Sequence, residues 1–544
     1  MQRKFIFVCG GVLSGLGKGI TAASIGLLLK SKGFKVTAIK IDPYLSVDAG
    51  TMRPAEHGEV FVTDDGGEID QDLGNYERFL DVSLTKNHNI TAGKVYQNVI
   101  NNERSFKYQG RDAEIFPDVI NEIKRLIISP TEGYEFVIVE IGGTSGDVEN
   151  LIFLHAAREL SREYPSIYVM VTYLPFLRNV GELKTKPTQH AVARLREVGI
   201  FPDIIITRSE IPIDKPRIET ISKRCFIPQD FIIDNSDVDN IYKIPLLLEE
   251  RGLTKKIFEK FKIKAREKDL KEWKKFVDGM ENSEKKIKVG LVGKYITHGS
   301  QKHKDVYISV LEAVKHASSK NKIQTEIIPI DSSEIEENGI KILEGLNGII
   351  IPQGWGSRGT EGKIKAIEFV RKNKIPYLGL CFGMQMAVIE FARNVCKLKD
   401  ANSSEANEKT KYPVIHIMPE QEKYLKKNQY GGTIRLGAWP CKLNPESKIY
   451  QIYKNSKNVM DKNNIVFERH RHRYEFNNDF KEVMEKNGLV IGGASPDGKL
   501  VESIELPEKM HPFFIGTQFH PEYKSTPLNP HPIFVEFIKK CSKN

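Results

Sequence analysis

The sequence predicts an α/β protein built from two doubly wound domains. In the first 250 residues, short apolar runs rich in β-branched residues alternate with longer helical stretches. A second series of the same kind begins after residue 286, and 544 residues suffice for two to four domains with cores of their own. Because the apolar runs are continuous, their strands are expected to be buried on both faces, as in a mostly parallel sheet.

The expected strands of both domains are short. They lie at residues 5–8, 36–41, 136–139, 167–172, 204–207 and 231–233 in the first domain, and at 287–292, 326–330, 348–352 and 377–380 in the second. The polar stretch 397–411 is expected to be a surface loop. The predicted domains are residues 1–253 and 287–544.

Residues 254–286 are expected to link the two domains. Residues 254–288 are dense in Lys and Glu, and their apolar side chains fall at helical spacing. These are Ile257, Phe258, Phe261, Leu270, Trp273, Phe276 and Val277. The pattern predicts one amphipathic helix that ends in a polar linker at 281–286, with Trp273 as a packing anchor.

Composition excludes several classes of protein. No apolar run approaches the ~20 residues that span a bilayer, and the first apolar stretch is too short for a signal peptide. The six cysteines are scattered without a Cys-x-x-Cys pair, which argues against zinc and disulfides. The net charge of 81 − 71 = +10 comes from lysines that are spread along the chain beside glutamates. We therefore expect a cytoplasmic protein with no membrane and no nucleic-acid partner.

A glycine-rich segment, residues 9–21 (CGGVLSGLGKGIT), lies between the first expected strand and a helix. Glycines let the backbone approach phosphates closely, the helix N-terminus attracts them, and Lys18 adds a positive charge. A turn without a ligand is the alternative, but the position of Lys18 favours phosphate. Gly19 stands where the Walker pattern has Ser or Thr, and the glycine spacing is one residue longer. These departures indicate the dethiobiotin-synthetase-like branch of P-loop proteins.

Two acidic residues could complete this site by holding Mg²⁺. Asp72 lies in the run Asp-Gln-Asp-Leu-Gly, and Glu140 ends an expected strand. A carboxylate at a strand end beside a phosphate loop is a common magnesium ligand. Glu140 could instead face water, but the run that follows it, 141–147 (IGGTSGD), favours a second ligand loop.

A cysteine and a histidine motif indicate a second centre. Cys381 lies between two glycines after an expected strand, in the G-x-C-x-G spacing of a nucleophile elbow. A helix N-terminus there would stabilise the thiolate, whereas a buried structural cysteine is the alternative. His520, in Phe-His-Pro-Glu, can act as general base with Glu522 orienting its imidazole. Together the three residues resemble a class I glutamine amidotransferase triad.

The segments 10–21, 40–52, 56–62, 72–79 and 140–144 resemble the synthetase domain of the CTP synthase family, and the resemblance runs from residue 3 to about residue 538. It implies a P-loop (dethiobiotin-synthetase-like) synthetase domain fused to a class I glutamine amidotransferase domain. It also implies Asp72 and Glu140 as Mg²⁺ ligands. The implied ATP-binding residues are Gly15, Leu16, Gly17, Lys18, Gly19, Ile20, Lys40, Asp72, Ser236, Asp237 and Val238.

The resemblance also implies a pyrimidine nucleotide site. Residues 184–190 (KTKPTQH) could by themselves be a solvated helix start, but in the family this motif binds UTP or CTP. The implied residues are Ser14, Asp147, Val148, Glu149, Lys184, Thr185, Lys186, Pro187, Thr188 and Gln189. The family usually has a lysine five residues before the position of Cys225, where this chain has Thr220. Either Lys223 or Arg224 supplies the missing charge, with Lys223 taken as the candidate, or the affinity for the nucleotide differs from that of the family.

The implied glutamine site has one further departure. Its residues are Gly354, Phe382, Gly383, Met384, Gln385, Glu405 and Arg473. Gly354 belongs to a glycine-rich oxyanion turn, in which Gln353 stands where the family has another glycine, and a side chain there needs a less permissive backbone. Arg473 ends the basic part of the run 469–475 (RHRHRYE), which is too short and isolated for a nucleic-acid groove.

The family chemistry would have two halves. Cys381 releases ammonia from glutamine, and ATP with Mg²⁺ activates the uracil 4-oxygen of UTP for displacement by that ammonia. The expected ligands are ATP, UTP and L-glutamine, with CTP as product inhibitor and GTP as activator, and the expected assembly is a homotetramer that can form filaments. The alternatives are an amidoligase related to cobyric acid synthase, a partition-type ATPase, and a structural filament protein. The Cys/His/Glu set disfavours the last two.

Overall fold

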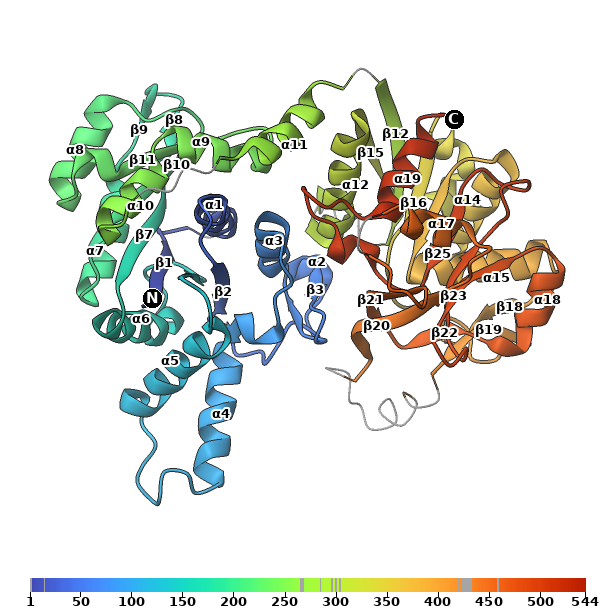
Figure 1. Cartoon of the computed structure of the whole chain (residues 1–544), viewed down its shortest axis with the longest axis horizontal. Coiled ribbons are helices and arrows are strands. Elements are labelled where there is room, and N and C mark those ends of the chain that lie inside the picture. The colour runs from blue at the N-terminus through green and yellow to red at the C-terminus, as the bar shows by residue number, and fades with distance from the viewer. Residues whose placement is uncertain are drawn as a thin grey trace. The chain divides into compact units, whose positions relative to one another are not determined.

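The computed structural model describes residues 2–13, 15–264, 269–283, 285–294, 297–298, 301–302, 305–418, 421, 433–456 and 459–544. The chain forms two compact units (Figure 1). The first unit comprises residues 1–49 and 72–274, and the second comprises 50–71 and 275–544. The units thus differ from the predicted sequential domains in two respects: residues 50–71 belong with the C-terminal half, and the expected linker is divided between the units after residue 274. Among the described residues, no helix has the length and apolar character needed to cross a membrane.

The first unit is built on a seven-stranded sheet in the order β11-β10-β7-β1-β6-β2-β5. Its strands are β1 (Lys4–Gly10), β2 (Val36–Asp42), β5 (Asn89–Thr91), β6 (Phe136–Ile141), β7 (Ser166–Tyr173), β10 (Ile204–Ser209) and β11 (Ile232–Ser236). All neighbouring pairs are parallel. The six predicted strands are confirmed, and the three-residue β5 was missed. Because parallel strands end at one edge, the loops after β1, β6 and β11 lie along the same edge.

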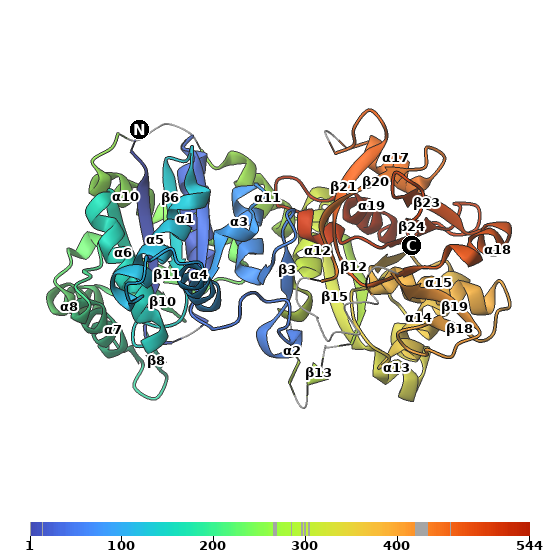
Figure 2. The same ribbon diagram turned by 90° about the horizontal axis from the view of Figure 1, so that it is seen from below.

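Helices cover both faces of this sheet (Figures 1 and 2). Helix α1 packs against β2, β6, α9 and α10, whereas α5 packs against α6 and α7 packs against α8. The helices are α1 (Lys18–Ser31), α3 (Gln71–Leu80), α4 (Ala92–Arg104), α5 (Ile120–Ile128), α6 (Leu151–Glu163), α7 (Lys186–Glu197), α8 (Lys215–Cys225), α9 (Ile244–Glu250) and α10 (Leu253–Phe261). A two-stranded hairpin, β8 (Phe176–Leu177) and β9 (Glu182–Leu183), precedes α7.

The predicted single linker helix is wrong. Helix α10 ends at Phe261, because the next residue, Lys262, has a left-handed backbone (φ 53°) that cannot continue an α-helix. A second helix, α11 (Lys271–Glu281), follows, and residues 265–268 lie outside the described part. The polar linker at 281–286 is also wrong in part, since Lys285 already begins a strand. Trp273 is a packing anchor as predicted: it is 2% exposed, its indole N–H donates to the Tyr242 carbonyl at 2.8 Å, and its ring packs on Phe79.

The second unit contains a nine-stranded sheet in the order β15-β12-β16-β17-β25-β24-β23-β20-β21. The strands are β12 (Lys285–Gly293), β15 (Ile323–Asp331), β16 (Gly348–Ile351), β17 (Tyr377–Leu380), β20 (Arg435–Leu443), β21 (Ile465–His472), β23 (Val490–Ala494), β24 (Val501–Glu505) and β25 (Phe514–Thr517). From β15 to β25 the pairs are parallel, and from β25 to β21 they are antiparallel. The four predicted strands are confirmed, and they all lie in the parallel half.

Helices and small sheets complete this unit. The helices are α2 (Pro54–His57), α12 (Ile308–Asn321), α13 (Ser332–Asn338), α14 (Thr360–Asn373), α15 (Phe382–Asn394), α17 (Lys448–Lys454), α18 (Lys481–Lys486) and α19 (Pro532–Cys541). Short sheets join β18 (Ala401–Ser403), β19 (Tyr412–Ile417) and β22 (Tyr474–Phe476), β13 (Thr297–His298) with β14 (Gln301–Lys302), and β3 (Val60–Val62) with β4 (Glu68–Asp70). The loop predicted at 397–411 is therefore wrong in part, because β18 lies within it and buries Ala401 and Ser403.

Candidate active sites

The predicted phosphate loop joins β1 to α1. Gly15 and Gly17 have φ values of 71° and 77°, a region that side chains other than glycine disfavour. Lys18 begins the helix, and its buried ammonium donates to the Gly143 carbonyl at 2.7 Å. This contact holds the phosphate loop against the loop that follows β6. Ser14, a predicted pyrimidine nucleotide ligand, lies outside the described residues.

The loop after β6 is tied to the phosphate loop at a second point. The Ser145 N–H donates to the Gly11 carbonyl at 3.1 Å. Within the loop, the Thr144 N–H donates to the Asp147 carboxylate at 2.6 Å, so this carboxylate fixes its own turn. Val148 and Glu149 follow as exposed residues of a short 3₁₀ turn. The two loops form one continuous rim at the carboxyl edge of the sheet.

Lys40 and two acidic residues form a buried charged cluster beside this rim. The Lys40 ammonium contacts Asp72 and Glu140, the latter at 3.0 Å, and Tyr76 donates to Glu140. Burial lowers the pKa of Lys40, but the carboxylates outweigh it and leave that pKa well above the usual value. Burial raises the pKa of Asp72, but the positive charge of Lys40 has the larger effect, so the pKa of Asp72 is lowered. At Glu140 the effect of burial is larger than that of Lys40, so the pKa of Glu140 is raised. The two predicted magnesium ligands therefore lie close together, and both contact the Lys40 ammonium.

Gly19 explains why the Walker hydroxyl is missing. A Cβ atom at this position would collide with the Asp72 carboxylate and would lie 3.4 Å from Glu140. The helix start is thus shaped around the two acids, which fits a cation held between carboxylates and phosphates. No group of three or more His, Cys, Asp or Glu within the described ranges could hold a metal by itself. Two carboxylates fit Mg²⁺, which keeps several waters and takes its remaining ligands from phosphates.

The predicted base-binding residues of the ATP site lie further along the same edge. Ser236 ends β11, three strands from β1. The Asp237 N–H donates to the Ser209 carbonyl at 2.9 Å, and its carboxylate accepts from Arg208 at 2.7 Å. Val238 follows in an irregular segment. A ligand that reached from the phosphate loop to these residues would lie along the carboxyl ends of the strands.

A pocket of about 360 Å³ lies between the β8–β9 hairpin, α7 and α8. Its lining consists of Glu182, Leu183, Lys184, Thr185, Lys186, Gln189, Pro216, Arg217, Thr220 and Arg224. Four of these are cations and one, Glu182, is an acid that contacts Lys184 and Arg217. The surplus of positive charge suits an anionic ligand.

Only part of the predicted pyrimidine site lines this pocket. Pro187 and the segment 147–149 are not in its lining, and the buried Thr188 hydroxyl bonds to Thr172 at 3.2 Å. Lys223 is also absent from the lining, whereas Arg224 is present. Arg217, Thr220 and Arg224 are spaced i, i+3 and i+7, so they share one face of α8. This spacing could have added the two arginines to the candidate residues, but it does not exclude Lys223, which stands seven residues after the lining residue Pro216.

Cys381 has the sharp backbone turn that is expected of a nucleophile elbow. The chain leaves β17, and Cys381 adopts φ 52° and ψ −101° before α15 begins. Such a backbone is strained for a residue with a side chain and is typical of functional turns. The flanking glycines allow it, since a Cβ at Gly379 would lie 2.8 Å from the Gly383 carbonyl carbon. The thiol therefore stands at the N-terminus of a buried helix.

His520 and Glu522 complete the predicted triad. The His520 Nδ1 lies 2.8 Å from a Glu522 oxygen, and both side chains are buried. Burial lowers the pKa of His520, but the Glu522 carboxylate and the Cys381 sulfur raise it by more, to about 10. The influence of Cys381 means that its sulfur is an electrostatic neighbour of the imidazole. The Gln518 side-chain amide also contacts that sulfur, at 3.5 Å.

The predicted oxyanion turn follows β16. The Gly356 N–H donates to the Glu405 carboxylate at 2.7 Å, which ties the turn to a predicted glutamine ligand. Gln353 does not have a positive φ, so its backbone accommodates a side chain, contrary to the expected difficulty. Its amide instead donates to Glu59 at 3.2 Å. Arg473, the predicted carboxylate anchor, is buried, and its guanidinium donates to Thr433 at 3.0 Å.

Two buried lysines beside this turn were missed. Lys294 donates to the carbonyls of Trp355 and Gly356, and Lys363 approaches the Pro352 carbonyl at 3.4 Å. Both ammonium nitrogens lie over the Phe382 ring, at 4.0 and 4.9 Å from its centroid. Burial lowers the pKa of Lys294 to about 8 and that of Lys363 well below its usual value. No sequence motif surrounds either residue, so only the fold identifies them.

Comparisons with known proteins agree across the chain. The family model described as CTP synthase N-terminus matches residues 4–263, and the one described as glutamine amidotransferase class-I matches residues 302–540. A CTP synthase of Caldanaerobacter subterraneus is 49% identical over 99% of this chain and 98% of its own length. One from Pyrococcus abyssi is 50% identical over 100% of this chain and 98% of its own. A CTP synthase of Carboxydothermus hydrogenoformans is 51% identical over 99% of this chain and 98% of its own length.

Proposed function

The chain belongs to the CTP synthase family, and on that premise we propose that it converts UTP, ATP, L-glutamine and water into CTP, ADP, phosphate and L-glutamate. One observation carries the proposal. The same chain holds a buried Cys381–His520–Glu522 set, which can release ammonia, and a phosphate loop with two converging acids, which can activate an oxygen with ATP.

In the glutaminase half, the Cys381 sulfur attacks the side-chain carbonyl carbon of glutamine. The negative charge on the carbonyl oxygen is stabilised by backbone N–H groups of the oxyanion turn at Gly354 and of Phe382, the residue after the nucleophile. The His520 imidazolium gives its proton to the departing ammonia, leaving a thioester. Water, deprotonated by His520, then displaces the sulfur and releases glutamate. Arg473 and Glu405 would hold the glutamine carboxylate and amino group.

In the synthetase half, residues 15–20, Lys18 and Lys40 would hold the ATP phosphates. Asp72 and Glu140 would hold Mg²⁺, which neutralises phosphate charge when bound. The UTP 4-oxygen takes the terminal phosphoryl group of ATP. Ammonia then forms a bond to C4 of the ring, and phosphate leaves with the oxygen. Neutral ammonia is the nucleophile, because ammonium has no free electron pair.

The pH dependence of glutamine hydrolysis should follow the His520 proton. With a pKa of about 10, the imidazolium persists through neutral pH, and activity falls only as this proton is lost at alkaline pH. Glu522→Gln removes the first of the charges that raise this pKa, so the alkaline limb of kcat/KM should move down by more than about one pH unit. Glutamate release measured from pH 6 to 11 checks this. An unchanged alkaline limb in the variant would contradict the assignment.

The cationic pocket is the proposed UTP site, with CTP as the competing product. Lys184, Lys186 and Arg224 supply cations for the triphosphate, and Thr185 and Gln189 supply hydrogen-bond donors. Arg224 has no acidic partner in the described part of the chain and lies on the face of α8 that carries Thr220. Arg224, rather than Lys223, therefore takes over the charge that the family places at Thr220.

Arg224→Ala should raise the KM for UTP about tenfold with little change in kcat, because one charged contact to the triphosphate is lost. Lys223→Ala is the matched control on the same helix and should change KM by less than about twofold. Adding Thr220→Lys to the Arg224→Ala variant should restore much of the affinity. Steady-state CTP formation over a range of UTP concentrations measures all three. A larger effect at Lys223 would refute the assignment.

The activity is tested by incubating the protein with UTP, ATP and Mg²⁺ and either glutamine or ammonium chloride, with CTP separated chromatographically. CTP from both nitrogen sources is the expected result. No CTP from either source would favour the amidoligase alternative.

The family resemblance supports four further parts of the proposal. These are activation by GTP, inhibition by CTP, a homotetramer that can form filaments, and a cytoplasmic location.

A further inference from the structure

We propose that residues 50–71, here called the hairpin segment, position the glutaminase site. This inference rests on the proposed glutamine hydrolysis at Cys381. The hairpin segment lies in the N-terminal part of the sequence but packs within the second compact unit. It reaches each of the three parts of the site, which are the oxyanion turn, the base and the nucleophile.

The first contact is at the oxyanion turn. Glu59 is buried and uses both carboxylate oxygens: one accepts from the Gln353 amide at 3.2 Å, and the other accepts from the Ser309 N–H at 3.0 Å. Gln353 directly precedes Gly354. The turn is therefore held from its outer side by a residue of the hairpin segment. This link depends on the side chain that replaces the glycine usual in the family.

The second contact is behind the base. The Tyr523 hydroxyl donates to the Val60 carbonyl at 3.1 Å, and the Phe61 ring meets Tyr523 edge-on at 5.2 Å. The Tyr523 ring in turn stacks on the His520 imidazole, with 5.0 Å between centroids and 16° between planes. The plane of the imidazole is thus supported by a ring that the hairpin segment holds.

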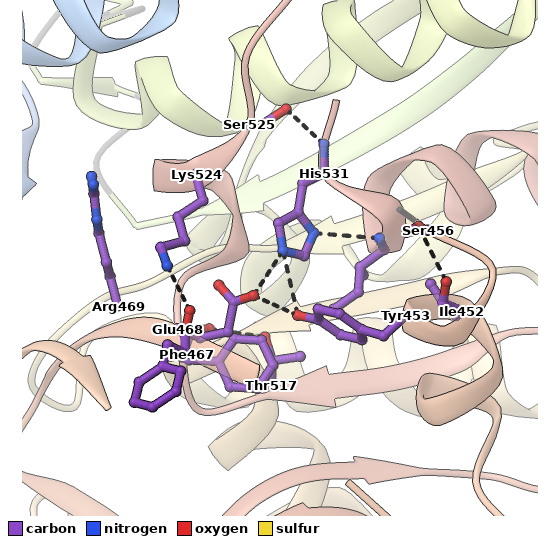
Figure 3. A network of polar contacts seen from close by, with 12 residues as sticks. Ile452, Tyr453, Ser456, Phe467, Glu468, Arg469, Thr517, Lys524, Ser525 and His531 are labelled. Carbon is purple, nitrogen blue, oxygen red and sulfur yellow. Dashed lines mark hydrogen bonds and ion pairs between the residues drawn. The ribbon is translucent and has the colours of Figure 1, made fainter. Parts of the chain in front are cut away.

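The third contact is at β21, beside the nucleophile. Asp64 pairs with the buried Arg469 at 2.6 Å, and Glu68 pairs with Arg471 at 2.9 Å. The Arg471 carbonyl is 3.8 Å from the Cys381 sulfur. Neighbouring residues of a strand face opposite sides. Figure 3 shows that Glu468, which directly precedes Arg469, points into a network with His531 and Tyr453. The strand is fixed by this network on one face and by the hairpin segment on the other.

The second unit is shaped to receive the hairpin segment. The Ala438 N–H of β20 donates to the Asp64 carbonyl at 2.8 Å. Gly437 has a φ of 84°, and a Cβ there would lie 2.7 Å from the Asp64 carbonyl oxygen. Only glycine allows so close an approach of the two backbones. After the hairpin the chain passes from Gln71 directly to Asp72, the proposed magnesium ligand.

An exchange of the Glu59–Gln353 pair tests the positioning role. Gln353→Glu places two carboxylates against each other, so it should displace the turn and lower kcat for glutamate release by about tenfold or more. The KM for glutamine should change little, because Glu405 and Arg473 are retained. Adding Glu59→Gln restores the pair in reverse, since the amide introduced at position 59 can donate to the carboxylate introduced at position 353 while its oxygen accepts from the Ser309 N–H. Activity should return to within about threefold of the unmodified protein.

Gln324→Glu, an exposed change on β15 in the same unit, is the matched control and should leave glutamate release unchanged. If Gln353→Glu loses glutamate release and the double variant does not recover it, the positioning role of the hairpin segment is refuted. Full glutamate release by Gln353→Glu would refute it as well. No glutamate release by the unmodified protein would instead refute the proposed function. Thermal melting of all variants separates lost positioning from unfolding.

Discussion

Cys381→Ala should lower CTP formation from glutamine by at least about a thousandfold while changing formation from ammonium by less than about twofold. The sulfur is the only group in the proposed mechanism that bonds to glutamine, so its loss removes the thioester route. Alanine carries a Cβ atom as cysteine does, so the change neither relieves nor adds steric strain at φ 52°, and the elbow should keep its shape. CTP formed from each nitrogen source, measured chromatographically, gives both rates.

Cys381→Ser is the control for shape, because it keeps the size of the side chain but supplies a weaker nucleophile. It should lose the glutamine route as well. Loss of the ammonium route in either variant would mean that Cys381 supports the fold rather than the chemistry. Retention of the glutamine route would exclude Cys381 as the nucleophile.

Lys40→Met should lower CTP formation by at least about a hundredfold from either nitrogen source, because Lys40 is proposed to contact the ATP phosphates. The variant also leaves Asp72 and Glu140 close together without their shared cation. Removal of one partner from a buried ion pair destabilises a protein by about 3–5 kcal/mol. The melting temperature should therefore fall, and Mg²⁺ should raise it more in the variant than in the unmodified protein.

Lys30→Met is the matched control for this change. Lys30 lies on α1 in the same unit, and its ammonium donates to the Leu80 carbonyl. Unlike Lys40, it does not pair with a proposed metal ligand. Its replacement should leave CTP formation within about threefold of normal. Normal ammonium-dependent activity in Lys40→Met would exclude Lys40 from the phosphate site. An equal response of both proteins to Mg²⁺ would contradict Asp72 and Glu140 as its ligands.

The sequence predicted the elements that local patterns encode. The buried parallel strands are continuous apolar runs, and the phosphate loop and the Cys381 elbow are contiguous motifs in which glycines permit one backbone course. The antiparallel half of the second sheet was not predicted, because β20 and β21 carry residues such as Arg435, Glu468 and Arg469 that are polar in sequence but buried in ion pairs. The break after Phe261 was missed because a left-handed lysine leaves no compositional signal.

By itself, the sequence determined the fold class, and it named the proposed phosphate loop, the paired acids and the Cys381, His520 and Glu522 set. Only the tertiary structure grouped residues 50–71 with the C-terminal half, turned Arg224 rather than Lys223 toward the pocket, and buried Lys294 and Lys363 beside the oxyanion turn. Local geometry depends on neighbours along the chain, which a motif records. The pairing of Glu59 with Gln353 joins segments that are 294 residues apart in the sequence, and these meet only when the chain has folded.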